Sequence, residues 1–396
     1  MSIQPFSIAI SPFVLEDLRE RLGRARWPDE IAGSGWAYGA NKDYLQHLCT
    51  HWGHGFDWKE QEEQLNTFHH FRADIDGFGL HFIHEKGKGS HSIPILLTHG
   101  YPDSFVRFVK LIPLLTQPGP NGLSFDVIVP SIPGYGFSDK PVGPGMNAAR
   151  VADLFARLMK EELGYPAFIA HGGDWGSSIS AQLALRFPHL LLGLHLTDVP
   201  ARNLVNWKEL QDLSRVEKDY LETGRQWYNA EGAYGMLQGT KPQTLAYAVN
   251  DSPVGLAAWI IEKFYAWTDH RGDLEAVYTM DELLTNLTVY WVTQTAGSAF
   301  RIYYESMQHP PKMAAGKIGT PAGFCIGPKD LVPPPRELAE RIFNVQSWTL
   351  PLAGGHFMAM EQPQQLAEDI FSFAATLTQK PANFPAHQRS GHNSPE

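Results

Sequence analysis

The sequence predicts an α/β protein with a mostly parallel central sheet, a helical cap inserted into the sheet and a helical arm at the N-terminus. Short apolar runs alternate with helical segments in two separate stretches of the chain, within 66–200 and within 317–379. Runs that are apolar along their whole length are typical of parallel strands covered on both faces. Residues 201–316 lie between these stretches. They are rich in Tyr and Trp and show no clear strand pattern, which predicts the cap.

Size and charge limit the possible functions. The 396 residues, of which 43% are hydrophobic, can bury a large core that carries a substantial insertion. The formal net charge of -10 argues against nucleic acid or an anionic membrane as a partner, because both require clustered Lys and Arg. No stretch approaches about eighteen consecutive apolar residues, and the N-terminus resembles no secretory signal, so no membrane anchor is expected. The two cysteines, Cys49 and Cys325, fit a reducing compartment, which predicts a cytoplasmic location.

Residues 1–65 are expected to form the arm. Ser11 can cap a helix whose first residue is Pro12, and leucines at helical spacing follow until Trp27-Pro28-Asp29 ends the helix. The arm also carries large aromatic residues, too many for a free tail. These are Trp36, Trp52, Phe56 and Trp58. The arm must therefore pack on the rest of the protein.

The core is expected to begin with a β-hairpin within 66–86, where alternating residues flank a turn at Asp76-Gly77. The parallel strands are then predicted at 93–98, 125–130, 167–170, 191–196, 321–326 and 347–350. The helices that cover them are predicted at 147–163, 177–187 and 364–377. The last segment, 380–396, is rich in Pro, His and Ser and is expected to be disordered.

The strongest chemical signal is the segment Gly172-Gly173-Asp174-Trp175-Gly176, between a predicted strand and a predicted helix. This is the G-x-nucleophile-x-G pattern of a sharp strand-to-helix turn, with Asp at the position that Ser occupies in esterases. A helix N-terminus favours negative charge, so an ionised Asp174 is a ready nucleophile. An Asp that only caps a helix after a Gly-rich turn would give the same pattern, so the pentapeptide alone leaves both interpretations open.

Two later residues complete a catalytic triad with Asp174. His356 follows Gly354-Gly355 after the last predicted strand, and Asp330 lies just past the strand that ends at Ile326. Alone, each has an ordinary interpretation, a loop histidine and a turn-forming aspartate. Together, the chain order of nucleophile, acid and histidine is that of α/β-hydrolases, with each residue following a predicted strand. The joint pattern predicts an α/β-hydrolase fold in which His356 is the base and Asp330 orients it.

The segment from His99 to Pro102 follows the first parallel strand, where this fold builds an oxyanion hole. The backbone N–H groups of Tyr101 and Trp175 could together hold a developing negative oxygen. An ordinary turn is the alternative interpretation. His99 and Pro102 flank the donor and are candidates for contact with a substrate.

The aspartate nucleophile indicates substitution at saturated carbon. A carboxylate that attacks an alkyl carbon becomes the acyl part of an ester, and water activated by His356 must then attack that ester. Epoxides and alkyl halides are therefore the main substrate classes. An epoxide oxygen becomes an alcohol and needs a proton donor, which a tyrosine hydroxyl can supply. Composition cannot choose among the tyrosines of the cap, which are Tyr220, Tyr228, Tyr234, Tyr247, Tyr265, Tyr278, Tyr290, Tyr303 and Tyr304.

With these motifs in place, the sequence resembles the microsomal-type epoxide hydrolase family, which includes insect juvenile-hormone and fungal members. The resemblance covers about residues 5–378 and includes the core motifs described above, with Gly354-Gly355-His356-Phe357. The arm and cap motifs are the most specific, because other α/β-hydrolases lack them. They are Arg26-Trp27-Pro28-Asp29, Gly35-Trp36-x-Tyr38-Gly39, Phe56-Asp57-Trp58, Thr240-Lys241-Pro242 and the stretch 250–258.

The resemblance implies an epoxide hydrolase in which two cap tyrosines polarise the epoxide oxygen. One corresponds to Tyr234, which precedes the Thr-Lys-Pro motif, and the other to Tyr303 in an Arg-x-Tyr-x-Glu segment. The adjacent Tyr304 is the alternative for this second position and a candidate substrate contact. The resemblance further implies a small hydrophobic epoxide as substrate, with no metal and no organic cofactor.

The sequence departs from this family in three places. The membrane anchor of the mammalian members is not expected here. Asp330 stands where those members have Glu, which preserves the role but can alter the rate of ester hydrolysis. Tyr101 replaces a common Trp, so the backbone donor is kept while the wall of the pocket changes.

Other functions share parts of this pattern. A haloalkane dehalogenase uses the same Asp elbow but needs halide-binding donors in the cap in place of the tyrosine pair. An inactive receptor has no need of Asp174, Asp330 and His356 together. A serine esterase is disfavoured because Ser177 and Ser178 lie beyond the elbow. A homodimer formed through the cap is compatible with the sequence.

Overall fold

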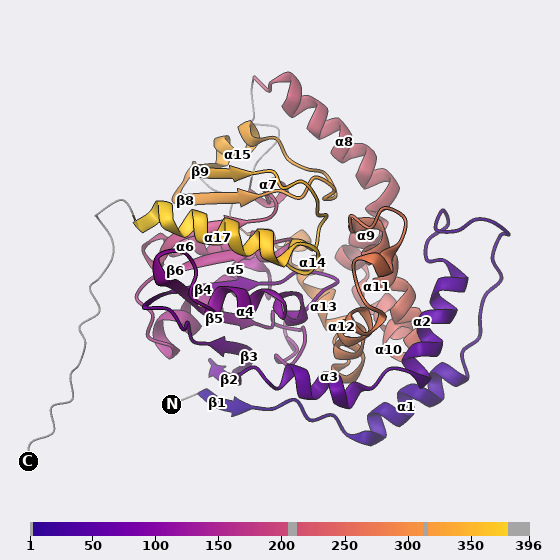
Figure 1. Cartoon of the computed structure of the whole chain (residues 1–396). Coiled ribbons are helices and arrows are strands. Elements are labelled where there is room, and N and C mark those ends of the chain that lie inside the picture. Colours follow the sequence, from indigo (N-terminus) through magenta and orange to yellow (C-terminus); the bar gives the residue numbers. More distant parts are fainter. Residues whose placement is uncertain (1–2, 205–211, 312–315, 379–396) are drawn as a thin grey trace, which may run out of the picture.

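A nine-stranded, mostly parallel sheet forms the centre of the protein in a computed structural model, which describes residues 3–204, 212–311 and 316–378 (Figure 1). The strand order is β1-β2-β3-β5-β4-β6-β7-β8-β9. The pairs β1–β2, β2–β3 and β3–β5 are antiparallel, and all pairs from β5–β4 to β8–β9 are parallel. The strands are β1 (Ile3–Phe6), β2 (His70–Ile75), β3 (Phe78–Glu85), β4 (His91–Thr98), β5 (Leu123–Pro130), β6 (Phe168–Gly172), β7 (Leu191–Leu196), β8 (Ile318–Cys325) and β9 (Phe343–Thr349).

The central strands are apolar because helices cover both of their faces. On β4, Ile95 lies between Val127 of β5 and Ile169 of β6, and all three side chains are fully buried. Helices α4 (Leu111–Thr116) and α17 (Pro363–Thr378) pack together on one face. Helices α5 (Ala148–Arg157) and α6 (Trp175–Arg186) pack together on the other (Figure 1). The predicted α/β class with a mostly parallel sheet is confirmed.

The cap is built entirely of helices within its described residues, 201–204 and 212–311. Two of its helices begin with a capping box, in which a hydroxyl and a glutamate satisfy the first free N–H groups. These are Ser214 with Glu217 and Thr279 with Glu282. The main cap helices are α8 (Arg215–Glu231), α9 (Ala233–Thr240), α10 (Pro242–Asp251), α11 (Pro253–Trp267), α12 (Met280–Thr293), α13 (Ala296–Ala299) and α14 (Arg301–Gln308).

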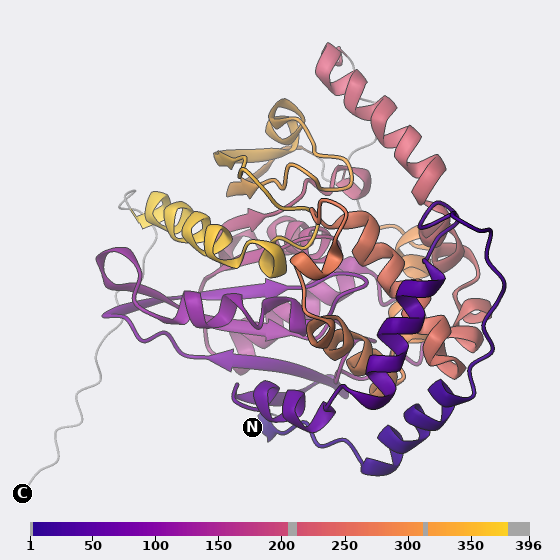
Figure 2. The ribbon, with the colours of Figure 1, turned by 45° about the vertical axis from the view of Figure 1, so that its right-hand side comes forward.

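The N-terminal arm joins the core to the cap. Its helices are α1 (Pro12–Gly23), α2 (Lys42–His54) and α3 (Trp58–Leu65), and α1 and α2 pack against α11 of the cap (Figure 2). The Trp52 indole N–H donates to Thr288 Oγ1 of α12 at 2.9 Å, and Trp36 stacks on Tyr265 with ring centroids 3.9 Å apart. Burial against the cap accounts for the aromatic residues of the arm.

One element of the arm was not predicted from the sequence. Strand β1 precedes the helix that was predicted from Ser11 and Pro12, and its Ile3 lies opposite Ala73 of β2. A strand of four residues that contains Pro5 carries too little pattern to be distinguished from a loop. The predicted disorder of 380–396 lies outside the described residues. No helix in the described part of the chain combines the length and apolar character needed to cross a membrane.

Candidate active site

Asp174 occupies a sharp turn between β6 and α6. Its φ and ψ are 57° and −124°, a backbone conformation that costs about 1–3 kcal/mol for a residue with a side chain. The turn requires close approach of neighbouring backbone, because a Cβ atom at Gly176 would lie 2.0 Å from the Thr98 carbonyl oxygen. The sequence therefore places Asp174 above the carboxyl edge of the sheet, as the motif predicted.

Two groups contact the Asp174 carboxylate. Its Oδ1 accepts a hydrogen bond from the Tyr101 backbone N–H at 2.9 Å, and its Oδ2 lies 3.5 Å from His356 Nε2. The side chain is 14% exposed, which leaves a narrow face open to the cavity described below. A carboxylate held in this way is oriented but still accessible for attack on a bound molecule.

His356 and Asp330 form a close pair beside Asp174. His356 Nδ1 donates to Asp330 Oδ1 at 2.7 Å, and the backbone N–H of Leu331 donates to the same oxygen at 2.7 Å. Asp330 follows β8, and its own N–H donates to the Gly327 carbonyl. The structure thus brings together the nucleophile, histidine and acid that the sequence predicted from three separate segments.

The charges around His356 decide its protonation state. Burial lowers the pKa of His356, but the charges and hydrogen bonds of Asp330 and Asp174 outweigh it and raise the pKa to about 10. An opposite charge favours the protonated ring, so the imidazolium is the resting form at neutral pH. Loss of charge on either carboxylate would lower the pKa of His356.

The loop after β4 supplies the N–H group that contacts the Asp174 carboxylate. The Tyr101–Pro102 peptide bond is cis, and the Gly100 N–H donates to Asp103 Oδ1 at 2.8 Å. Asp103 pairs with Arg107, whose Nη2 donates to the His356 carbonyl oxygen at 2.9 Å. Burial raises the pKa of Asp103, but the Arg107 charge outweighs it and lowers the pKa to about 2. This buried ion pair therefore fixes the loop and the histidine relative to one another.

Trp175, the second predicted oxyanion donor, is the first residue of α6. The N–H groups of a helix's first turn have no partner within the helix. The Trp175 side chain also lines the cavity and packs edge-on against Tyr303, with ring centroids 4.8 Å apart. The Trp175 side chain thus forms part of the wall, and its backbone N–H lies next to Asp174 in the chain.

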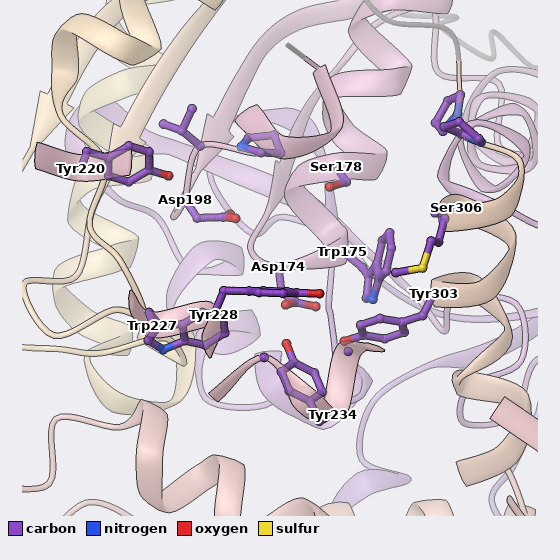
Figure 3. A pocket seen from close by; sticks show the side chains of 17 residues that line it. Asp174, Trp175, Ser178, Asp198, Tyr220, Trp227, Tyr228, Tyr234, Tyr303 and Ser306 are labelled. Atoms are coloured by element: carbon purple, nitrogen blue, oxygen red, sulfur yellow. The ribbon is translucent and has the colours of Figure 1, made fainter. Parts of the chain in front are cut away.

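A cavity of about 420 Å³ opens in front of Asp174, between the core and the cap (Figure 3). Tyr234 of α9 and Tyr303 of α14 face it, with ring centroids 6.1 Å apart, and their hydroxyls point toward the space beside Asp174 (Figure 3). Burial, and then the neighbouring Tyr234 and Asp174, raise the pKa of Tyr303 well above its usual value. The Tyr303 hydroxyl therefore stays protonated and able to donate.

Three residues predicted to contact substrate do not line this cavity. His99 is fully buried behind the loop, where Nδ1 donates to the Gly100 carbonyl at 2.9 Å and Nε2 accepts from the Ile132 N–H at 3.1 Å. The Pro102 carbonyl accepts from Asn286 Nδ2 at 2.9 Å, and Tyr304 is 37% exposed on the outer side of α14. Hydrogen bonds hold His99 and the Pro102 carbonyl, and Tyr304 is partly exposed, so contact of these three residues with a substrate stays a prediction.

Sequence reasoning missed several residues of the cavity. Asp198, just after β7, lines it and accepts a hydrogen bond from Ser177 Oγ. Burial, and then the charge of Asp330, raise the pKa of Asp198 to about 7. Its position after a predicted parallel strand was a usable signal. From α8, Trp227 and Tyr228 also line the cavity (Figure 3).

In the ranges that the structure describes, His, Cys, Asp and Glu side chains do not gather into a group of three or more that could hold a metal ion. The polar groups at the cavity are instead the donors and acceptors of an acid–base site. They are two carboxyl groups, a histidine beside one of them, and tyrosine hydroxyls.

Comparison with known protein families gives two matches. Residues 3–108 match the family described as epoxide hydrolase N terminus, and residues 93–277 match the alpha/beta hydrolase fold. The fold, the strained Asp elbow and the adjacent His–Asp pair thus define an α/β-hydrolase with an aspartate at the elbow.

Individual relatives identify the family more narrowly. Epoxide hydrolase 1 of Sus scrofa is 37% identical over 96% of this chain and 90% of its own length. A Stigmatella aurantiaca protein, named only as a candidate epoxide hydrolase, is 42% identical over 93% of this chain and 84% of its own length. The crystal structure of juvenile hormone epoxide hydrolase from Bombyx mori superposes with a TM-score of 0.83 at 31% identity, covering 96% of this chain and 94% of that one. The chain belongs to the epoxide hydrolase family.

Proposed function

We propose that this enzyme adds water to a small hydrophobic epoxide and releases a vicinal diol, through an ester formed on Asp174. The observation that carries the proposal is that the Asp174 carboxylate and the hydroxyls of Tyr234 and Tyr303 face the same cavity. A nucleophile and neutral proton donors on opposite sides of a bound ring are what epoxide opening needs. The reaction requires neither a metal nor an organic cofactor.

In the first half-reaction, Tyr234 and Tyr303 donate hydrogen bonds to the epoxide oxygen. An Asp174 oxygen attacks one ring carbon, a new C–O bond forms, and the ring C–O bond breaks. The released oxygen takes a proton from a tyrosine and becomes the first hydroxyl of the product. The negative charge passes from Asp174 to that tyrosine, which is later reprotonated.

In the second half-reaction, His356 removes a proton from water, which attacks the Asp174 carbonyl carbon. The backbone N–H groups of Tyr101 and Trp175 stabilise the oxyanion, a contribution of about 3–4 kcal/mol per donor in comparable enzymes. Collapse of this intermediate breaks the ester C–O bond, and the leaving alkoxide takes the proton of the His356 imidazolium to become the diol. The carboxylic acid left on Asp174 then loses its proton, which restores the carboxylate and offsets the proton that the tyrosine gave up. Asp330 accepts from His356 Nδ1 and favours the imidazolium that forms at this step.

Esterification also activates the histidine. The free enzyme holds His356 as an imidazolium between two carboxylates, and the ester removes the charge of Asp174. Loss of that charge lowers the pKa of His356, so the neutral base is populated only after the substrate has been captured.

A pH study tests this activation. The rate of ester hydrolysis is expected to rise with pH and level off at a pKa below about 10, the value in the free enzyme. Histidine NMR of the free enzyme gives the pKa of His356 before ester formation. The pH dependence of single-turnover hydrolysis of preformed ester gives its pKa in the ester. Equal pKa values in the two states would contradict the proposed role of the Asp174 charge.

A single turnover in ¹⁸O-water, with enzyme in excess over a simple aryl epoxide, tests the ester itself. The first diol is expected to carry ¹⁶O from Asp174, and the peptide containing Asp174 is expected to gain ¹⁸O. A labelled diol with an unlabelled peptide means that water attacks the epoxide directly. Haloalkanes assayed in parallel are expected to release no halide, because the cap presents tyrosine hydroxyls to the cavity.

We also propose a cellular location and an oligomeric state. Cys49 and Cys325 are both buried and unpaired, which supports a reducing, cytoplasmic compartment. A homodimer through the cap is supported by Tyr247 of α10, whose side chain is 72% exposed. Sedimentation of the full chain, compared with that of Tyr247→Glu, tests the dimer.

A further inference from the structure

Each backbone N–H group from Gly354 to Phe357 donates to a carboxylate or a carbonyl oxygen. The Gly354 N–H donates to Asp269 Oδ2 at 3.1 Å, and the His356 N–H donates to the Trp267 carbonyl at 2.8 Å. The Gly355 and Phe357 N–H groups donate to Glu361 Oε2 and Oε1, at 2.7 and 2.8 Å. The loop that carries the histidine is thus held by two carboxylates and one carbonyl.

Glu361 makes a third contact that reaches the cap. Its Oε2 also accepts from the Asp269 N–H at 2.9 Å, just after α11 ends at Trp267. Among the described residues Glu361 forms no ion pair with Lys, Arg or His, so three backbone N–H groups carry its stabilisation. Burial raises the pKa of Glu361 above its usual value, and these N–H groups offset only part of that rise. Hydrogen bonds to a charged acceptor are about twice as strong as neutral ones, which makes this a firm attachment.

The cap segment held by Glu361 contacts a residue from each of the two proposed half-reactions, His356 and Tyr234. The Trp267 ring lies 5.2 Å from the His356 ring and 5.2 Å from the Tyr234 ring, measured between centroids. The approach is close, because a Cβ atom at Gly355 would lie 2.4 Å from the Trp267 carbonyl oxygen. A shift of this segment would therefore move the histidine loop with it.

We propose that Glu361 is a positioning residue that locks the histidine loop to the cap segment 267–269 and so sets His356 for ester hydrolysis. The inference rests on the proposed role of His356 as the base of the second half-reaction. Glu361 does not touch the substrate, and it acts only through the backbone on either side of His356.

The variant Glu361→Gln tests the proposal. An amide keeps the size of the side chain but has one acceptor oxygen, so at least one of the three N–H groups loses its partner. Alkylation of Asp174, which does not use His356, is expected to stay within about 3-fold of wild type. Ester hydrolysis is expected to slow by about 10- to 100-fold, because small displacements of a catalytic group have effects of this size. The ester should therefore accumulate, as measured by mass spectrometry of the quenched protein.

Three comparisons make the outcome decisive. Glu368→Gln, an exposed change on the neighbouring helix α17, is expected to leave both rates unchanged. In the background of His356→Ala, Glu361→Gln is expected to have no further effect on hydrolysis, which a general loss of structure would not reproduce. Asp269→Ala, which removes the acceptor of the Gly354 N–H, should also slow hydrolysis selectively, and it provides the test if Glu361→Gln fails to fold.

Two results overturn the positioning role: an equal fall in both rate constants, or normal hydrolysis in a folded variant. The wild-type control separates this failure from failure of the proposed function. If wild-type enzyme forms no ester on Asp174, the proposed mechanism is wrong. If wild type forms and hydrolyses the ester but Glu361→Gln does not slow hydrolysis selectively, only the inference about Glu361 is wrong.

Discussion

Asp174→Asn is expected to lower diol formation by about 10⁴- to 10⁶-fold while the protein stays folded, because an amide is a poor nucleophile toward carbon. Asn is the suitable replacement, since it tolerates the positive φ of 57° at this position better than most residues. The variant should also form no ester. Product analysis by mass spectrometry, with circular dichroism to verify folding, measures both effects.

The matched control for this variant is Asp219→Asn. Asp219 lies on α8 with its side chain 72% exposed, and it makes only a loose pair with Arg215 at 3.8 Å. The same change of charge at this exposed position outside the cavity lining is expected to leave turnover unchanged. Diol formation near the wild-type rate by Asp174→Asn would disprove the assignment of the nucleophile.

Loss of both cap tyrosine hydroxyls is expected to stop alkylation. General acids contribute about 10²- to 10⁴-fold to reaction rates, so each single change, Tyr234→Phe or Tyr303→Phe, should slow ester formation by about 10²-fold. In the double variant the rate of ester formation should fall to the limit of detection. Trp175 and Trp227 line the same cavity, so a stopped-flow change in their fluorescence can follow ester formation. The rate of ester hydrolysis in the single variants should change little.

Tyr304→Phe is the control for the tyrosine pair. Tyr304 follows Tyr303 directly but lies outside the cavity with 37% of its surface exposed. This variant is expected to alkylate at the wild-type rate. A larger loss from Tyr304→Phe than from Tyr303→Phe would mean that the second proton donor has been assigned to the wrong residue.

The core and the triad were predictable because their signals are local. Asp174 lies in a pentapeptide with glycines at fixed positions, and His356 and Asp330 each follow a recognisable strand. The apolar run of β7 was predicted at its full extent, Leu191–Leu196, because both faces of that strand are covered. In these places the local sequence preference and the tertiary environment agree, as in most well-folded sequences.

The cap and the supporting contacts needed more than local pattern. Tyr234 and Tyr303 lie on different helices, and only the resemblance to a family selected them from the other cap tyrosines. Asp198 and Glu361 were missed because their roles depend on neighbours far away in sequence. Glu361, for example, bonds to Asp269, which lies 92 residues earlier. The spacing of Asp103 and Arg107 suggests a helical ion pair, but nothing in it indicates the contact with the His356 carbonyl.

The position of the arm affects how substrate enters the active site and how product leaves it. Strand β1 at its start pairs with β2 of the core, α1 and α2 in its middle pack on the cap, and α3 leads back to β2. A cap strapped to the core in this way cannot swing open as a hinged lid without breaking contacts such as that between Trp52 and Thr288. We therefore expect epoxide and diol to pass through an entrance of fixed width between side chains of the cap and the core. The width of that entrance, as well as the volume of the cavity, then limits the size of the substrate. Attempts to broaden the substrate range should begin with the residues at the entrance.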